Sequence, residues 1–256
     1  MPPKDDYIRS RIAINIESLA EILDKNQVVV DTGPLYKAAG SCRNYFKSGM
    51  WGYTVENLIF RRLGDLKTIP QNVDIRDIVL ELSVFAEGFC RPANGHDPLS
   101  TLEFNIEIHA EYIGLNDSIE KCDSAWHLDR HDDSGQDNPA KNPEFLHPAY
   151  HIHFGGRSLE NAIGNNNSYI LILDSPRIAH PPMEAVLGVD FVLTNFLNAS
   201  MVTFRDEGNY ISIIKTMQDW IWKPYVESLF CIWQPNPTQS PWKPINIWPQ
   251  LCSHHY

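Results

Sequence analysis

The alternation of apolar and polar residues between Leu102 and Tyr112 is the feature that most restricts the fold of this chain. Even-numbered positions there are apolar or aromatic, and odd-numbered positions are polar or charged. Because successive side chains of a β-strand point to opposite faces of a sheet, this pattern predicts a strand with one buried and one polar face. An antiparallel sheet that is covered on one side accommodates such a strand.

Further segments have the composition of strands and are separated by turn residues. They are residues 78–89, 122–131, 149–154 and 169–175. The last segment, YILILDS, is apolar on both faces, which favours burial on both sides. Since consecutive strands are joined by short connections, an antiparallel meander of about five strands is the simplest topology. The three valines at 28–30 predict one more short strand.

Helical periodicity is confined to the two ends of the chain. Residues 5–24 place apolar side chains on one stripe, residues 183–197 are apolar nearly all round, and residues 209–231 form a third segment in which Pro224 predicts a kink. The fold class is therefore α+β, with an N-terminal helix and two C-terminal helices packed on one face of the meander.

We expect a single domain over residues 1–232, followed by an extended tail rich in proline and tryptophan at 233–256. Within the domain, the predicted parts are an N-terminal helical part (1–75), the sheet (76–176) and the C-terminal helices (183–232). The tail cannot form regular helix or a central strand because of its prolines. Its three tryptophans favour packing on the body over a free tail.

Residues 35–67 differ from the rest of the chain in charge. Six basic residues stand against two acidic ones, and aromatic residues lie between them. The simplest interpretation is one or two helices with a solvated basic face. The alternatives are a contact surface for an anionic partner or an RNA strand, and docking onto the protein's own acidic sheet.

The polar face of the predicted sheet gathers histidines and carboxylates. On a strand, residues two apart lie roughly 7 Å from each other, and cross-strand neighbours lie about 5 Å apart, so two adjacent strands can surround a metal ion. Imidazole with carboxylate suits zinc, iron or manganese. Metal-free catalysis, or a structural role in which the histidines pair with acidic residues, remains an alternative. The candidate ligands are His127, Asp129, His131, His151 and His153.

A glycine pair followed by arginine offers a second kind of site. Gly155 and Gly156 permit a positive φ and close approach of the backbone, and Arg157 would supply charge for an anion, together with Arg61 or Arg62. A β-hairpin turn is the simpler interpretation of the pair. No GxxxxGK[ST], GxGxxG, HExxH or GxSxG motif is present, so standard phosphate-loop, zinc-protease and esterase chemistry has no support in the sequence.

Charge and composition limit the kinds of partner that the chain is expected to bind. The formal charge of −11 argues against a general nucleic-acid binder and favours a basic or neutral partner. No apolar run approaches the roughly 18 residues of a membrane span. The five cysteines form no CxxC pair, which indicates reduced thiols and a cytoplasmic protein.

The segments HPAYHIHFGG and PRIAHPPMEAVLGVDFVLTNF, within residues 147–196, resemble uncharacterised bacterial domain families with the pattern HPxxHxHxG…RIxxxPxxPxxxxxFxL. The match covers about a fifth of the chain. It implies a bacterial origin and a locus such as a toxin–antitoxin or phage-defence system.

These patterns lead to three expectations about function. The first is an intracellular subunit or protein-binding module, with a protein partner or as a homo-oligomer. The second is a metal-dependent hydrolase or nuclease that uses the histidine-rich face. The third is an anion or nucleotide sensor.

Overall fold

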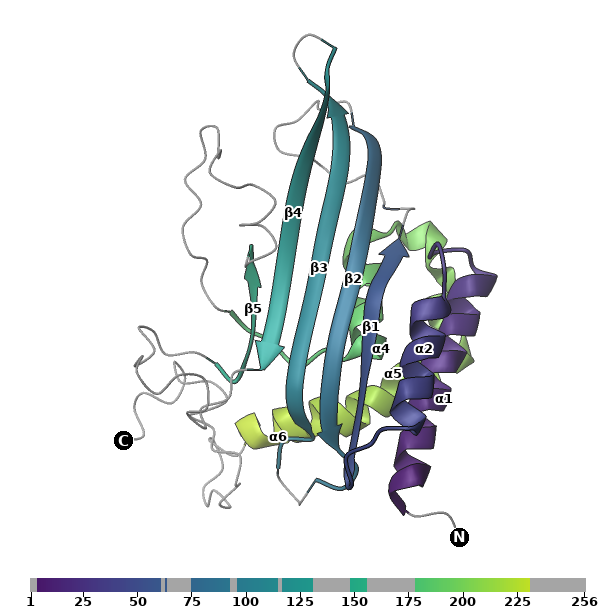
Figure 1. The fold of residues 1–256 in the computed structure, drawn as a ribbon, viewed down its shortest axis with the longest axis vertical. Helices are drawn as coiled ribbons and strands as arrows, with labels where there is room; N and C mark the ends of the chain where they lie inside the picture. Colours follow the sequence, from purple (N-terminus) through teal and green to yellow (C-terminus); the bar gives the residue numbers. More distant parts are fainter. Residues whose placement is uncertain are drawn as a thin grey trace.

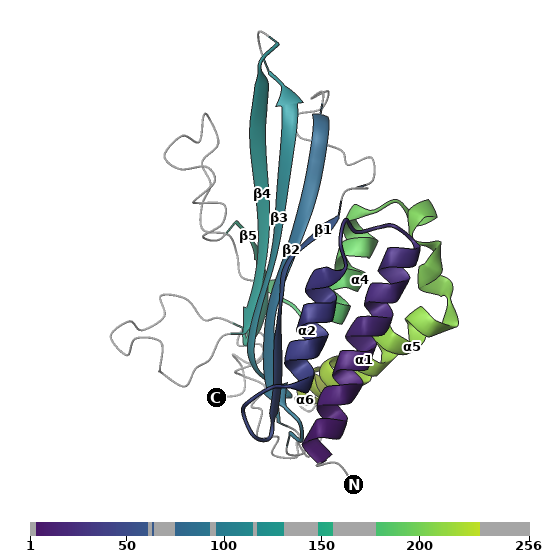
Figure 2. The same ribbon diagram turned by 45° about the vertical axis from the view of Figure 1, so that its right-hand side comes forward.

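A computed structural model describes residues 4–60, 63, 75–92, 96–114, 117–130, 148–155 and 178–230. The described residues form two layers, a twisted antiparallel sheet and a set of helices that all lie on one of its faces (Figures 1 and 2). The predicted α+β class, with helices from both ends of the chain on one face, is confirmed.

The sheet is a meander in which the strands follow one another in chain order and every neighbouring pair is antiparallel. The described residues form six strands where about five were expected, and the predicted strand at 169–175 lies outside the described residues. The strands are β1 (Met50–Phe60), β2 (Ile75–Phe89), β3 (Leu99–Ile113), β4 (Ile119–Arg130), β5 (Tyr150–Phe154) and β6 (Ile178–Ala179).

The helices begin and end close to the predicted positions. Pro224 interrupts the last helical segment as expected, because it cannot donate a backbone hydrogen bond and its ring crowds the preceding turn; the turn before it widens into a π-helix. The helices are α1 (Lys4–Lys25), α2 (Gly33–Arg43), α4 (Ala185–Phe196), α5 (Gly208–Met217), the π-helix η3 (Gln218–Trp222) and α6 (Lys223–Phe230), with short 3-10 turns at Ala199–Met201 and Thr203–Asp206.

The core lies between the two layers. The predicted apolar face of β3 is turned toward the helices, and Phe104 at its centre is fully buried. Helix α4 approaches this ring so closely that a Cβ atom on Gly188 would lie 2.4 Å from it. Glycine is therefore required at this helix position for the two layers to meet. Strands β2, β3 and β4 rise beyond the helical layer at one end (Figure 2).

The helical interpretation of residues 35–67 is wrong for its second half. Among the described residues of this segment, only those of α2 are helical, and Met50–Phe60 forms β1. The alternation of buried residues there is broken by a bulge between Val55 and Leu58, where Asn57 has a φ of 52°. Because the bulge shifts the alternation by one residue, the segment does not have the period of a regular strand. The predicted strand at 28–30 is also wrong, since only Val29 forms an isolated bridge with Phe60.

Two of the basic residues in the 35–67 segment pair with acidic residues of the same chain. Arg43 of α2 forms a salt bridge with Glu17 of α1, and Lys47 forms one with Glu87 of β2. Docking of this segment onto the protein's own acidic sheet, one of the predicted alternatives, fits the pair of Lys47, whereas Arg43 pairs with a helix instead.

Candidate functional site

The sheet face opposite the helices holds the predicted cluster of histidines and aspartate. In the register of β4 with β5, His127 lies opposite His153, and Asp129 lies opposite His151. Since partners in register point to the same face, the four side chains form one group. The sequence had placed them on one face through their spacing of two residues, and the structure brings them together.

Both carboxylate oxygens of Asp129 face a histidine. Nε2 of His151 lies 3.0 Å from Oδ1, and Nε2 of His127 lies 3.4 Å from Oδ2. The ring of His153 is close to both histidines, with centroid distances of 5.2 Å to His127 and 5.7 Å to His151. A carboxylate between imidazoles is the centre of the cluster.

The other ring nitrogens of His127 and His151 meet oxygen atoms. Nδ1 of His127 is 2.5 Å from Oδ1 of Asn105 on β3, and Nδ1 of His151 is 3.3 Å from the carbonyl oxygen of Pro148. The Pro148 carbonyl can only accept a hydrogen bond, so this contact requires a proton on Nδ1 of His151, while Nε2 of the same ring faces Asp129. This arrangement fixes the orientation of the ring, and His151 is almost fully buried.

Asp129 is held in its charged form. Burial raises the pKa of its carboxyl group, but the hydrogen bond from His127 and the charges of His151, His127 and His153 outweigh burial and bring the pKa below its usual value. Its Oδ1 atom is buried and has no aligned hydrogen bond, although Nε2 of His151 is at ion-pair distance.

The predicted metal site includes a fifth residue besides the four in this cluster. His131, the fifth predicted ligand, lies outside the described residues. Among the residues that the structure describes, no group of three or more histidine, cysteine, aspartate and glutamate side chains is arranged to hold a metal ion. Metal binding by this cluster therefore stays a prediction.

The rest of the helix-free face is rich in carboxylates. His109 contacts Asp123 at 2.6 Å and Glu107 at 3.7 Å. Two other positions bring like charges together, because Glu81 lies opposite Glu107 and Glu103 lies opposite Asp129 in the register of the sheet. Like charges directly opposite each other destabilise a sheet.

The three predicted anion-binding arginines, Arg61, Arg62 and Arg157, lie outside the described residues, so the structure does not test them. Gly155 has the positive φ, 99°, that the sequence predicted for the glycine pair, and its N–H donates to the carbonyl of Ala125. His180 is a largely buried histidine with Nδ1 2.6 Å from the Pro181 carbonyl oxygen, and burial lowers its pKa.

Two buried polar networks were not predicted, and the first of them lies next to the site. Asp97, between β2 and β3, accepts hydrogen bonds from Arg130 at 2.8 Å and from the Tyr150 hydroxyl at 2.7 Å, and so connects the end of β4 to the start of β5. Glu184 caps α4 and contacts Tyr53 of β1. Neither acid belongs to a motif, and no signal in the sequence distinguishes them from surface acids.

The chain matches no model of a protein family, and the searches of curated proteins and of solved structures found no significant match. No helix in the described part of the chain is long and apolar enough to cross a membrane. The interpretation of the site therefore depends on its own geometry.

Proposed function

We propose that the chain is a protein-binding module that uses the helix-free face of its sheet to bind a cationic segment of a partner protein. The observation that supports this best is the pair of like-charge contacts in the sheet, Glu81 opposite Glu107 and Glu103 opposite Asp129. Histidines of the same chain lie beside Glu107 and Asp129, and a partner that supplies lysine or arginine side chains would offset the charge of Glu81 and Glu103 as well.

Two of these carboxylates lack a cation of their own. Within the described part of the chain, neither Glu81 nor Glu103 forms an ion pair, whereas Glu87 on the same face is paired with Lys47. Glu103 is also exposed. Two carboxylates without an ion pair among the described residues are therefore located on the helix-free face of β2 and β3.

The negative charge of the helix-free face favours a protein partner over a nucleic acid. A surface of carboxylates repels phosphate, so a nucleic acid is a poor occupant, in keeping with a net charge of −11. Basic protein segments fit it. A bacterial toxin–antitoxin or phage-defence system, the setting that the sequence resemblance implies, would supply such a partner from a neighbouring gene, and this remains a proposal.

Replacement of Glu81 and Glu103 by glutamine is expected to stabilise the isolated chain and to weaken binding of a cationic peptide. Removing the like-charge contacts should raise the free energy of unfolding by about 0.5 kcal/mol, measured by urea denaturation. Binding of a fluorescent decalysine peptide, followed by anisotropy, should weaken about tenfold. A gain in stability with a loss of binding is typical of residues kept for function.

The matched control changes the same amount of charge on the helical side. Glu21 and Asp24 are exposed residues of α1, and a Glu21→Gln, Asp24→Asn variant carries the same net charge as the sheet variant. If the control weakens peptide binding as much as the sheet variant does, the attraction is diffuse and the proposal is wrong. Equal affinity for spermine and for the peptide would point to a small polyamine instead of a protein partner.

A metal-dependent hydrolase is the second candidate, and two features of the histidine cluster favour it. The Nδ1 atoms of His127 and His151 face carbonyl oxygens, which is how metal-binding histidines are usually oriented, and Oδ1 of Asp129 is buried without an aligned hydrogen bond. Zinc, manganese or iron would find imidazole and carboxylate donors in this cluster, and a bound ion would supply an activated water.

Zinc or manganese is expected to stabilise the tag-free protein if this second candidate is correct. At about 100 times its Kd, a metal ion should raise the free energy of unfolding by about 2.7 kcal/mol, and chelation should reverse the gain. The Asp129→Asn variant should lose the effect. His109→Gln on the same face should keep it, since His109 is paired with Asp123 away from the cluster. A wild-type protein that neither gains stability nor carries metal in elemental analysis would exclude the hydrolase.

A further inference from the structure

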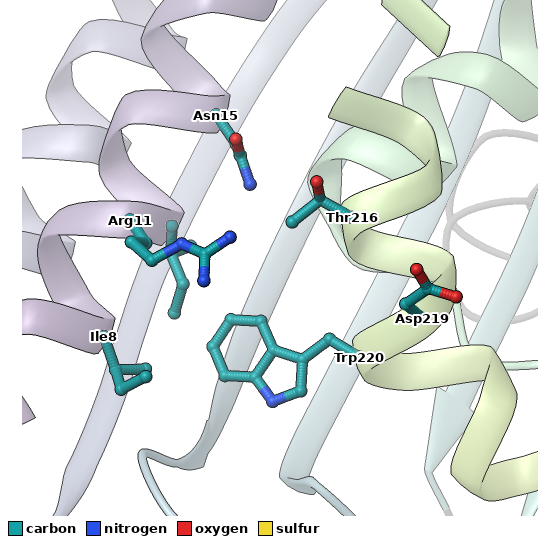
Figure 3. A pocket seen from close by; sticks show the side chains of 7 residues that line it. Ile8, Arg11, Asn15, Thr216, Asp219 and Trp220 are labelled. Carbon is teal, nitrogen blue, oxygen red and sulfur yellow. The ribbon is translucent and has the colours of Figure 1, made fainter. Parts of the chain in front are cut away.

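A cavity of about 350 Å³ opens between α1 and the helical segment formed by α5 and η3, on the side of the helical layer away from the sheet (Figure 3). It is far from the histidine cluster in the fold and shares no residue with it. Ile8 and Ile12 of α1 and Trp220 of η3 make its apolar walls. The polar lining residues are Arg11, Asn15, Thr216 and Asp219.

The π-helix shapes one wall of the cavity. Asp219 and Trp220 lie in this widened turn, which Pro224 imposes four residues further on. The indole of Trp220 packs against the buried ring of Trp51 at 5.5 Å and extends toward α1 (Figure 3). Wide turns of this kind are often found at functional sites, because they turn a side chain away from the regular helical direction.

Arg11 brings an available charge into the cavity. Its guanidinium group points into the space between the helices, toward Thr216 and Trp220 (Figure 3). Its contact among the described residues is with the ring of Tyr7, 5.9 Å from the guanidinium carbon, and no carboxylate of the described part forms an ion pair with it. The carboxylate of Asp219 points away from Arg11 in the same view.

Asn15 adds a hydrogen-bond donor on the same wall. Its one hydrogen-bond contact within the described part of the chain is at 3.7 Å, from Nδ2 to the sulfur of Met217. A thioether is a weak acceptor, so this amide can turn to a better one at little cost. Arg11 and Asn15 are four residues apart on α1 and therefore lie on the same side of the helix.

We propose that this cavity binds a small organic carboxylate with an apolar or aromatic body. The planar guanidinium of Arg11 matches a carboxylate with two parallel hydrogen bonds, and the amide of Asn15 supplies a further donor. The body of the ligand packs on Trp220, Ile8 and Ile12. The volume is at the small end of the range for ligand pockets, which limits the ligand to one ring or a short chain.

A monoanion fits this cavity better than a phosphate. Arg11 is the one cation among the described residues that line the cavity, whereas phosphate sites commonly gather several donors and positive groups. Asp219 at the opposite wall adds a negative charge that opposes a second negative charge on the ligand. This inference does not depend on the proposed function of the sheet face.

Titration of the full chain with phenylacetate, followed by calorimetry and tryptophan fluorescence, tests the proposal. Saturable binding is expected for phenylacetate. Phenylacetamide, which has the same shape without the charge, should bind about tenfold more weakly or not at all. The Arg11→Gln variant should lose phenylacetate affinity by a similar factor. Arg11 is exposed, so this variant is expected to fold.

Two comparisons decide the outcome. Lys25→Gln removes a positive charge at the far end of α1 and should leave the affinity unchanged. Absence of saturable binding to the wild-type protein, equal binding of the amide, or unchanged affinity in Arg11→Gln would each overturn the proposal. Tighter binding of phenyl phosphate than of phenylacetate would overturn the choice of a carboxylate.

Discussion

Replacement of Glu184 by alanine is expected to lower the free energy of unfolding by about 3 kcal/mol. This fully buried carboxylate accepts hydrogen bonds from the Tyr53 hydroxyl at 2.5 Å and from the backbone N–H groups of Val186 and Leu187 at 3.0 and 2.9 Å. Alanine would leave these buried donors unsatisfied at the first turn of α4. Urea denaturation at neutral pH measures the loss.

The pH dependence of the free energy of unfolding gives an independent check on the burial of Glu184. Burial raises the pKa of Glu184, and the hydrogen bonds from Tyr53, Val186 and Leu187 only partly oppose this. The folded state therefore holds its proton more tightly than the unfolded state does. The stability that comes from this proton is fully present below pH about 4.5 and is lost as the pH rises through the folded pKa.

Glu184→Gln is the matched control for both measurements. Glutamine retains an oxygen acceptor for the helix cap but does not titrate, so its loss of stability should be smaller than that of alanine. Its stability should also lack the decline that Glu184 causes with rising pH. If alanine and glutamine destabilise the protein equally, the oxygen acceptor that glutamine retains does not support the cap of α4, and the hydrogen-bond argument is wrong.

The strands that were predicted correctly are those whose alternation is unbroken. In β3, every even position from Leu102 to Ala110 faces the helices, and the same rule placed His127 and Asp129 on the opposite face of β4. It also predicted the directions of Tyr150 and Ile152, which are buried. These are local properties of the backbone, so the sequence is sufficient to predict them.

β1 was missed because its alternation is interrupted. The bulge at Glu56 and Asn57 shifts the apolar positions from odd to even numbers, so that Tyr53 and Val55 are followed by Leu58 and Phe60 on the same face. The alternation of this segment therefore has the pattern of two short fragments and not of one strand. Only the pairing with β2, which is a long-range interaction, makes it one strand.

The site was predictable in its residue types but not in its supporting contacts. Spacing alone indicated that the strands of His127 and His151 could meet. It gave no sign that Asn105 and the Pro148 carbonyl would orient the two rings, because these contacts depend on register and on rotamers. The cavity beside Arg11 could not be predicted either, because it lies between two helical segments that are far apart in the sequence.

Replacement of Asp97 by asparagine is expected to lower the free energy of unfolding by about 3 kcal/mol and to loosen β5. Asp97 is nearly buried and faces Arg130, whose side chain is also largely buried. Burial raises the pKa of Asp97, and the charge of Arg130 opposes this rise. Asparagine keeps the shape but removes the charge that stabilises a buried guanidinium. Hydrogen exchange of the β5 amides should show the loosening.

A double-mutant cycle with Tyr150→Phe separates the two contacts of Asp97. Loss of the Tyr150 hydroxyl alone should cost about 1 kcal/mol. Because both changes weaken the same hydrogen bond, one at its acceptor and one at its donor, the double variant should be less destabilised than the sum of the single variants, by about 0.5–1 kcal/mol. Strict additivity would mean that Tyr150 and Asp97 act separately. In that case Asp97 would not connect the start of β5 to the end of β4, and His151 would owe its position next to Asp129 to the strand pairing alone.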